Sequence, residues 1–214
     1  MNKKIKTFLL ISSAVAVLAF VYVYIQFLSN NTQKIEKELY VKIPTGATYD
    51  DVKKIIAPYI KNMSAFETIA QLRKYDKNVK SGRFLLKNGM GAFAQVTSMR
   101  QNVPVNLAFN NQERLENLCL RISSQIEPDT TKLLKVFRDS VFLKENGFTK
   151  ENLLGMFVPN SYEFYWNISA EKFRDKMLAE YKKFWTKERL TKAEALQMTP
   201  IEVIVATPGL LLVQ

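Results

Sequence analysis

The stretch "LYVKIPTGATYDDVKKIIAPYI" at residues 39–60 decides the fold class. Its first five residues alternate, with Leu39, Val41 and Ile43 on one side, and this alternation predicts a β-strand. Pro44-Thr45-Gly46 is typical of a turn. A helix is expected directly after the turn, because an N-cap threonine and an acid three residues later begin a run of apolar residues at helical spacing.

The next segments complete a small unit. Thr48 and Asp51 are the expected capping pair of the first helix, and Ser64 with Glu67 gives a second S-x-x-E helix start. The sequence "SGRFLL" at 81–86 predicts a turn and a short strand. Strand, helix, helix and strand together predict a compact α+β module over residues 39–86.

The first residues of the chain predict a membrane anchor. Residues 8–28 carry no charge, and 21 residues in a helix span about 30 Å of hydrocarbon. The lysines that precede them favour a cytoplasmic tail at residues 1–7, which puts the rest of the chain outside the cytoplasm. The polar residues 29–38 are then expected to form a stalk.

A cleaved signal peptide is the alternative interpretation of this segment. The sequence "AVA" at 14–16 resembles a cleavage site, and cleavage there would release a secreted soluble protein. About ten further apolar residues follow it, which exceeds the usual length of a signal peptide's apolar region and favours the anchor.

Composition excludes several kinds of chemistry. The chain has 214 residues, of which 47% are hydrophobic and 24% charged, as in one or two ordered domains. It has no histidine, which excludes histidine-based triads and histidine metal ligands. Its one cysteine, Cys119, lies on an apolar helical stripe and is interpreted as a small buried hydrophobe. No metal or cofactor is expected.

The net charge is +11, which suits anionic lipid headgroups or an acidic polymer. A nucleic-acid partner is not expected for an anchored domain outside the cytoplasm. A plain solvated surface is the alternative explanation of the charge.

The second half of the chain is expected to be mainly helical. The sequence pattern predicts helices over 91–101, 112–126 and 129–145, a short one from Thr149, a longer one from Ser169 to about Trp185, and a strand at 103–109. Pro104 favours an edge position for that strand.

The segment "GMFVPNSYEFYW" at 155–166 is the most unusual. Five aromatic residues surround a predicted Pro-Asn-Ser turn. Core packing is the usual role of such residues, whereas exposed aromatics beside polar groups can stack on sugar rings. In the second case, the substrate-binding candidates are Asn160, Ser161, Tyr162 and Glu163.

The order of these features resembles the YceG-like endolytic murein transglycosylase family, also called MltG, and "FVPNSYEFYW" is similar to its Bacteroidetes-type members. The module over 39–86 resembles the LysM type of glycan-binding module. Family members commonly have E-G-x-x-x-P-D-T-Y. Here Gly155, Pro159 and Tyr162 agree with that motif, Asn160 and Ser161 are close to it, and Leu154 replaces the acid.

This resemblance implies an inner-membrane lyase that cleaves nascent peptidoglycan strands and leaves 1,6-anhydro ends. One glutamate would act first as acid and then as base, unlike the two-carboxylate glycosidases. The implied partners are peptidoglycan glycan strands, the membrane and cell-wall synthesis proteins.

The stretch "TPIEVIVATPGLLLVQ" at 199–214 bears on catalysis. Thr199 is a good N-cap and Glu202 completes a capping box, so we interpret Glu202 as a cap. In the family, the corresponding helix continues through "LASIVQEET", whose acidic cluster contains the catalytic glutamate. The resemblance therefore places that glutamate just beyond Gln214, and Glu163 does not lie at the matching position.

The sequence thus predicts an α+β fold with a transmembrane helix, a LysM-like module and an incomplete transglycosylase domain at 87–214, truncated or frameshifted before its catalytic residue. Two functions remain open. One is a family transglycosylase that lacks its acid in this form, and the other is a non-catalytic, membrane-anchored peptidoglycan-binding or scaffold protein.

The topology is directly testable. Two reporters can be fused after residue 40, one that is active only in the periplasm and one that is active only in the cytoplasm. The periplasmic reporter alone should be active, because residues 8–28 are expected to cross the membrane with the preceding lysines in the cytoplasm. Activity of a cytoplasmic reporter at the same position would contradict this topology.

Overall fold

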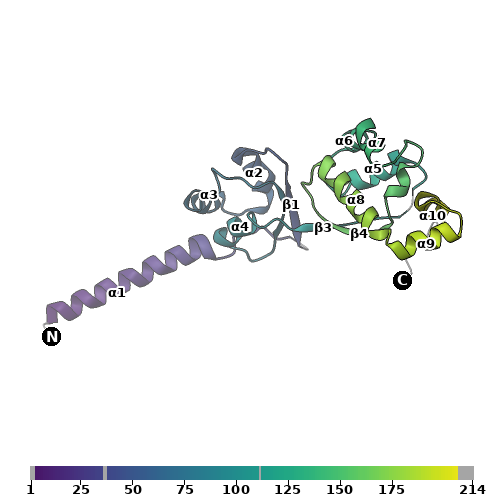
Figure 1. Cartoon of the computed structure of the whole chain (residues 1–214). Coiled ribbons are helices and arrows are strands. Elements are labelled where there is room, and N and C mark those ends of the chain that lie inside the picture. The colour runs from purple at the N-terminus through teal and green to yellow at the C-terminus, as the bar shows by residue number, and fades with distance from the viewer. Residues whose placement is uncertain (1–2, 36–37, 111, 207–214) are drawn as a thin grey trace. The chain divides into compact units, whose positions relative to one another are not determined.

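The computed structural model describes residues 3–35, 38–110 and 112–206. The chain forms two compact units that divide between Val103 and Pro104, and each is described by itself. The first unit contains α1 (Lys3–Val23), η1 (Tyr24–Leu28), β1 (Leu39–Ile43), α2 (Tyr49–Ile56), η2 (Ala57–Tyr59), α3 (Met63–Leu72), β2 (Gly82–Leu86) and α4 (Ala92–Ser98) (Figure 1).

The chain begins with an exposed apolar helix. Among the described residues, one helical segment, Lys4–Leu28, is long and apolar enough to cross a membrane. It includes all of the span predicted at residues 8–28, and its side chains are exposed except for Gln26 and Phe27 near its end, which are half-buried.

The strand–helix–helix–strand order predicted for 39–86 is confirmed. β1 and β2 pair antiparallel, from Leu39 opposite Leu86 to Ile43 opposite Gly82. The helices α2 and α3 supply buried apolar residues to the same core. The core also includes Ala92, Val96 and Met99, so it extends past residue 86 into α4 and the residue that follows it.

Local capping explains where these helices begin. Thr48 caps α2 in a full capping box, in which the Asp51 N–H donates to Thr48 Oγ1 at 3.2 Å and the Thr48 N–H donates to Asp51 Oδ2 at 3.0 Å. The predicted start of the second helix at Ser64 is wrong. α3 begins at Met63, because the Asn62 side chain accepts a hydrogen bond from the Ala65 N–H at 3.0 Å.

The segment after the apolar helix, expected to be a polar stalk, makes buried contacts where the structure describes it. Asn31 and Thr32 are buried. The Asn31 side chain accepts from the Asn62 N–H at 2.7 Å and donates to Gln95 Oε1 at 3.0 Å, while Gln95 Nε2 donates to Thr32 Oγ1 at 3.1 Å. We call Asn31, Thr32, Asn62 and Gln95 the polar cluster. It joins the end of the apolar helix to α3 and α4.

The second unit packs helices against a two-stranded sheet. It contains β3 (Pro104–Phe109), α5 (Leu115–Ser123), α6 (Thr130–Phe137), α7 (Ser140–Glu145), η3 (Leu153–Met156), β4 (Asn160–Tyr165), α8 (Ala170–Phe184), α9 (Lys187–Ala195) and α10 (Pro200–Ala206). The region predicted to be helical at 129–145 contains two helices, because Asp139 caps a new start by accepting from the Phe142 N–H at 2.8 Å.

The prediction of a turn over Asn160 and Ser161 is also wrong, because both residues begin β4. This strand pairs antiparallel with β3, from Pro104 opposite Tyr165 to Phe109 opposite Asn160.

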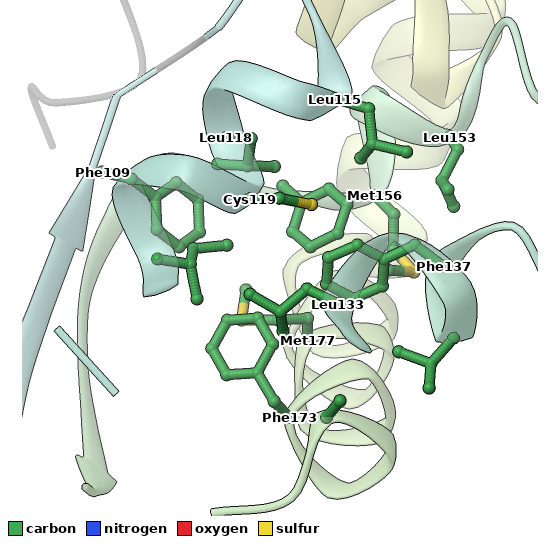
Figure 2. Close-up of a cluster of buried hydrophobic side chains, with 14 of the residues drawn as sticks. Phe109, Leu115, Leu118, Cys119, Leu133, Phe137, Leu153, Met156, Phe173 and Met177 are labelled. Atoms are coloured by element: carbon green, nitrogen blue, oxygen red, sulfur yellow. The ribbon is translucent and has the colours of Figure 1, made fainter. Parts of the chain in front are cut away.

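Aromatic side chains form much of the second core, part of which Figure 2 shows. Phe137 packs edge-on against Phe157 with ring centroids 4.9 Å apart, and Phe164 lies 4.7 Å from Phe173. Cys119 is fully buried among them, and burial raises the pKa of its thiol to about 12. The interpretation of Cys119 as a small hydrophobe is therefore confirmed.

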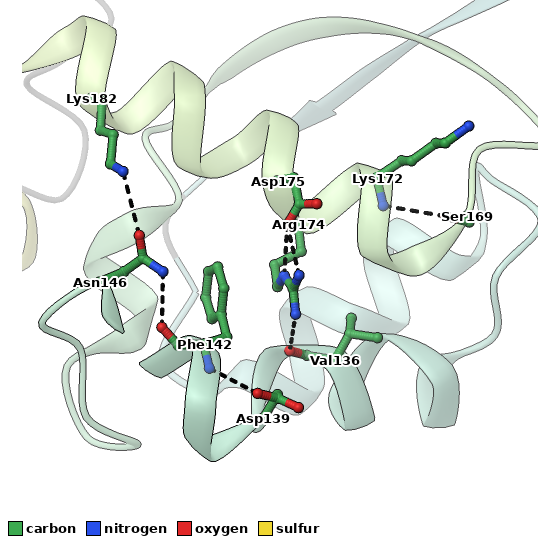
Figure 3. A network of polar contacts seen from close by, with 9 residues as sticks. All are labelled: Val136, Asp139, Phe142, Asn146, Ser169, Lys172, Arg174, Asp175 and Lys182. Atoms are coloured by element: carbon green, nitrogen blue, oxygen red, sulfur yellow. Dashed lines mark hydrogen bonds and ion pairs between the residues drawn. The ribbon is translucent and has the colours of Figure 1, made fainter. Parts of the chain in front are cut away.

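A polar network fastens α8 to α6 and α7 (Figure 3). The Arg174 guanidinium donates to the Val136 carbonyl oxygen at 3.4 Å, lies 4.2 Å from the Phe142 ring centroid and pairs with Asp175 Oδ1 at 2.8 Å. Its aliphatic stem and planar head let one side chain bridge three elements.

The polar cluster gives a stability prediction. Asn31→Ala should destabilise the first unit by about 1–3 kcal/mol, because the backbone N–H of Asn62 and the Gln95 amide lose buried partners. Thermal unfolding of the full chain in detergent micelles, followed by circular dichroism, measures the change. The exposed Asn78→Ala serves as the control, and equal unfolding temperatures for the two variants would contradict the role of the cluster.

Candidate functional site

The β3–β4 pair has one face in the core and one in solvent. Successive side chains of a strand point to opposite faces of the sheet. Leu107, Tyr162 and Phe164 are buried, so the residues next to them in each strand point toward solvent. The exposed side chains are Asn106, Ala108, Ser161, Glu163 and Tyr165, which we call the β3–β4 face. The register sets Asn106 opposite Glu163 and Ala108 opposite Ser161, so these groups lie close together.

Tyr165 is the most distinctive residue of this face. Of the five aromatics in 155–166, Phe157, Tyr162, Phe164 and Trp166 are buried, whereas Tyr165 is 56% exposed. Core packing is therefore the role of four of the five, and Tyr165 alone among them presents its ring to solvent. The sequence analysis did not single out Tyr165, although the alternation of buried and exposed positions in "NSYEFY" could have indicated it.

The structure separates the four predicted binding residues. Ser161 and Glu163 lie on the β3–β4 face, and Asn160 is exposed at the start of the strand, where its Oδ1 accepts from the Ser161 N–H at 2.7 Å. Tyr162 points into the core. Its ring stacks on Phe109 with centroids 5.6 Å apart, its hydroxyl donates to the Val158 carbonyl at 2.6 Å, and burial raises its pKa to about 12.

The neighbouring helix holds β4 in place. Lys176 of α8 donates from Nζ to the Glu163 carbonyl oxygen, and the same Nζ lies 4.4 Å from the Phe164 ring centroid. The face thus carries a carboxylate, an amide, a hydroxyl and a flat ring on a backbone that the core fixes. Such a set suits a polyhydroxylated ligand, which needs hydrogen-bond partners and an apolar surface for its C–H groups.

Glu202 is a helix cap, as predicted. Its carboxylate accepts from the Thr199 N–H at 2.7 Å and from the Thr199 hydroxyl at 2.8 Å, and α10 begins at Pro200. These hydrogen bonds lower the pKa of Glu202, which favours the ionised form and disfavours a role as general acid. Val213 and Gln214, where the family resemblance places the approach to the catalytic glutamate, lie outside the described residues.

Seven described carboxyl groups have a lowered pKa. A general acid at neutral pH needs a raised pKa, normally from burial. Within residues 3–206, less the gaps at 36–37 and 111, the carboxyl groups whose pKa clearly shifts all shift downward: Glu38, Asp51, Glu116, Asp129, Glu151, Glu188 and Glu202. The same residues contain no cluster of three or more His, Cys, Asp or Glu side chains that could hold a metal ion.

The glycine of the aromatic segment has a packing role. A Cβ atom on Gly155 would lie 2.8 Å from Cγ2 of Ile201, so the missing side chain lets α10 pack against η3. The preceding Leu154 borders a hollow of about 360 Å³ that is also lined by Glu113, Glu116, Arg138, Lys150 and Glu151.

Comparison with known proteins agrees with the family resemblance. The model of the YceG-like family matches residues 41–207. A crystal structure of a YceG-like protein from Listeria monocytogenes matches with a TM-score of 0.42 and 23% sequence identity, covering 78% of this chain and 61% of the Listeria chain. The chain therefore spans less than two thirds of that relative. A search of curated proteins gives no significant match. From the family match over 41–207, the chain belongs to the YceG-like family.

Proposed function

We propose that this chain is a membrane-anchored part of an endolytic murein transglycosylase and that it binds peptidoglycan glycan strands. The family match and the exposed apolar helix support the proposal. The observation that carries it is the β3–β4 face, where the exposed Tyr165 ring shares a surface with the Glu163 carboxylate and the Asn106 amide.

The chemistry of a glycan strand fits this face. The C–H face of a sugar ring would stack on Tyr165, while Glu163 accepts hydrogen bonds from hydroxyl or N-acetyl N–H groups. Asn106 both donates and accepts, so it suits an N-acetyl group. Ser161 adds a hydroxyl at the far end of the face.

In the transglycosylase reaction, a protonated glutamate would donate to the glycosidic oxygen and then accept the proton of the sugar's 6-hydroxyl, leaving a 1,6-anhydro end. The part of this chain described here would hold and orient the strand, which lowers the entropic cost of reaching the reactive geometry. The LysM-like module at 39–86 would add a second, weak glycan contact.

The proposed location is the inner membrane, with both units in the periplasm, since lysines precede the apolar helix and nascent strands lie outside the cytoplasm. Cell-wall synthesis proteins are the proposed partners. A non-catalytic glycan-binding or scaffold protein is the second candidate, since it needs only a glycan-binding surface such as the β3–β4 face.

The binding site can be tested by substitution. Tyr165→Ala should weaken the binding of soluble, uncrosslinked glycan strands to the full chain by about 3- to 10-fold, because the stacking surface is lost. Isothermal titration calorimetry in detergent measures the affinity. Leu120→Ala removes a large apolar side chain from α5 that is also more than half exposed, and it should leave the affinity unchanged. Equal affinities for wild type and Tyr165→Ala would place the site elsewhere.

Catalysis can be tested separately. The 214-residue chain should yield no 1,6-anhydro products from uncrosslinked glycan strands by mass spectrometry, because general acid catalysis needs a positioned proton donor. Adding a family-like "LASIVQEET" continuation with its downstream segment should produce them. Products from the unmodified chain that vanish with Glu163→Gln or Glu202→Gln would show that the acid lies within it.

A further inference from the structure

The first unit exposes few large apolar side chains outside its N-terminal helix. Among its described residues beyond Leu28, the large apolar side chains that are exposed are Leu72 at 73% and Phe93 at 40%. Leu72 ends α3 and Phe93 lies in the first turn of α4. Both helices pack against η1, the last turn of the apolar segment. The exposed apolar groups therefore lie on the two elements that adjoin the end of the proposed membrane helix.

The contact between η1 and α4 is very close. Gly91 precedes α4, and a Cβ atom at this position would lie 2.5 Å from the Leu28 carbonyl oxygen, so only glycine permits the approach. The Asn31 N–H next donates to the Met90 carbonyl at 2.9 Å, and the polar cluster fixes the segment that follows. The start of α4 is thus held against the point where the chain leaves the apolar helix.

Basic side chains lie next to Phe93 and directly after Leu72 in the chain. The Arg73 guanidinium lies 4.8 Å from the centroid of the Phe93 ring, and Arg100 donates from Nη1 to the Arg73 carbonyl at 2.8 Å. Lys74 follows Arg73 and is exposed. We call Leu72, Arg73, Lys74, Phe93 and Arg100 the basic–apolar patch.

Lys74 adopts an unfavourable backbone conformation. Its φ is 55°, in the left-handed region, and it occupies the position after the end of α3 where glycine is usual. The Tyr75 N–H donates to the Ala70 carbonyl at 2.7 Å and completes this helix end. Glycine at this position would remove the charge and relieve the backbone strain.

We propose that the basic–apolar patch binds the anionic phospholipid headgroups of the leaflet from which the apolar helix emerges. The proposal rests on the anchoring proposed above. Leu72 and Phe93 enter the boundary between headgroups and acyl chains, while Arg73, Lys74 and Arg100 pair with lipid phosphates. A membrane surface is the proposed partner of the patch because η1 and the polar cluster hold α3 and α4 beside the end of the proposed membrane helix.

The test uses the full chain in lipid nanodiscs with Cys119→Ala. Spin labels are placed at Gln71→Cys and Ala94→Cys, exposed neighbours of the patch, and at the exposed Lys54→Cys of α2 as the matched control. Collision rates with oxygen and with a water-soluble nickel chelate report depth. In discs that contain phosphatidylglycerol, labels 71 and 94 should be more accessible to oxygen and less accessible to the nickel chelate than label 54. The difference between these labels and label 54 should be smaller in discs of pure phosphatidylcholine.

Lys74→Gly tests the charge without endangering the fold. It should unfold at the same or a higher temperature than the parent, since it relieves the left-handed strain, and it should weaken the phosphatidylglycerol-dependent contact about five-fold. Two results would overturn the proposal. In the first, labels 71 and 94 have the same oxygen and nickel accessibility as label 54 in both lipids. In the second, their difference from label 54 is as large in pure phosphatidylcholine as with phosphatidylglycerol. A chain that fails to enter nanodiscs would instead refute the anchoring.

Discussion

The antiparallel pairing of β3 with β4 is the constraint on which the second unit and its candidate site depend. Its register sends Tyr162 and Phe164 into the aromatic core, where Phe164 meets Phe173 at 4.7 Å. The same register must then send Glu163 and Tyr165 outward, because neighbouring strand residues point to opposite faces. The buried packing that stabilises this unit therefore also fixes the geometry of the surface proposed to bind glycan.

The first unit depends on a different kind of interaction. Its polar cluster buries Asn31 and Thr32 and joins the end of the apolar helix to the body of the unit. Buried polar groups of this kind are costly unless every partner is present, so they specify one arrangement rather than a range of them. The unit is thus coupled directly to the end of its apolar helix.

Elements whose signals are local could be predicted from the sequence. Thr48 and Thr199 were identified as caps and Ser169 as the start of a helix, and each of the three accepts a hydrogen bond from a backbone N–H three residues later. What depends on distant partners could not be predicted in this way. The buried state of Asn31 requires Gln95, 64 residues away, and β4 requires β3 about fifty residues earlier. Within the site, the structure finds Asn160, Ser161 and Glu163 exposed and Tyr162 buried. The alternation of the strand could have separated Tyr162 from Tyr165, but only once the segment is recognised as a strand and not as a turn.

Hydrogen–deuterium exchange of the full chain, with and without uncrosslinked glycan strands, tests the central claim most directly. The account predicts that added glycan slows exchange at residues 104–109 and 160–165, with little change in α5, which carries the exposed Leu120. Protection confined to residues 39–86, or no protection at any segment under saturating glycan, would contradict the assignment of the β3–β4 face as the glycan-binding surface.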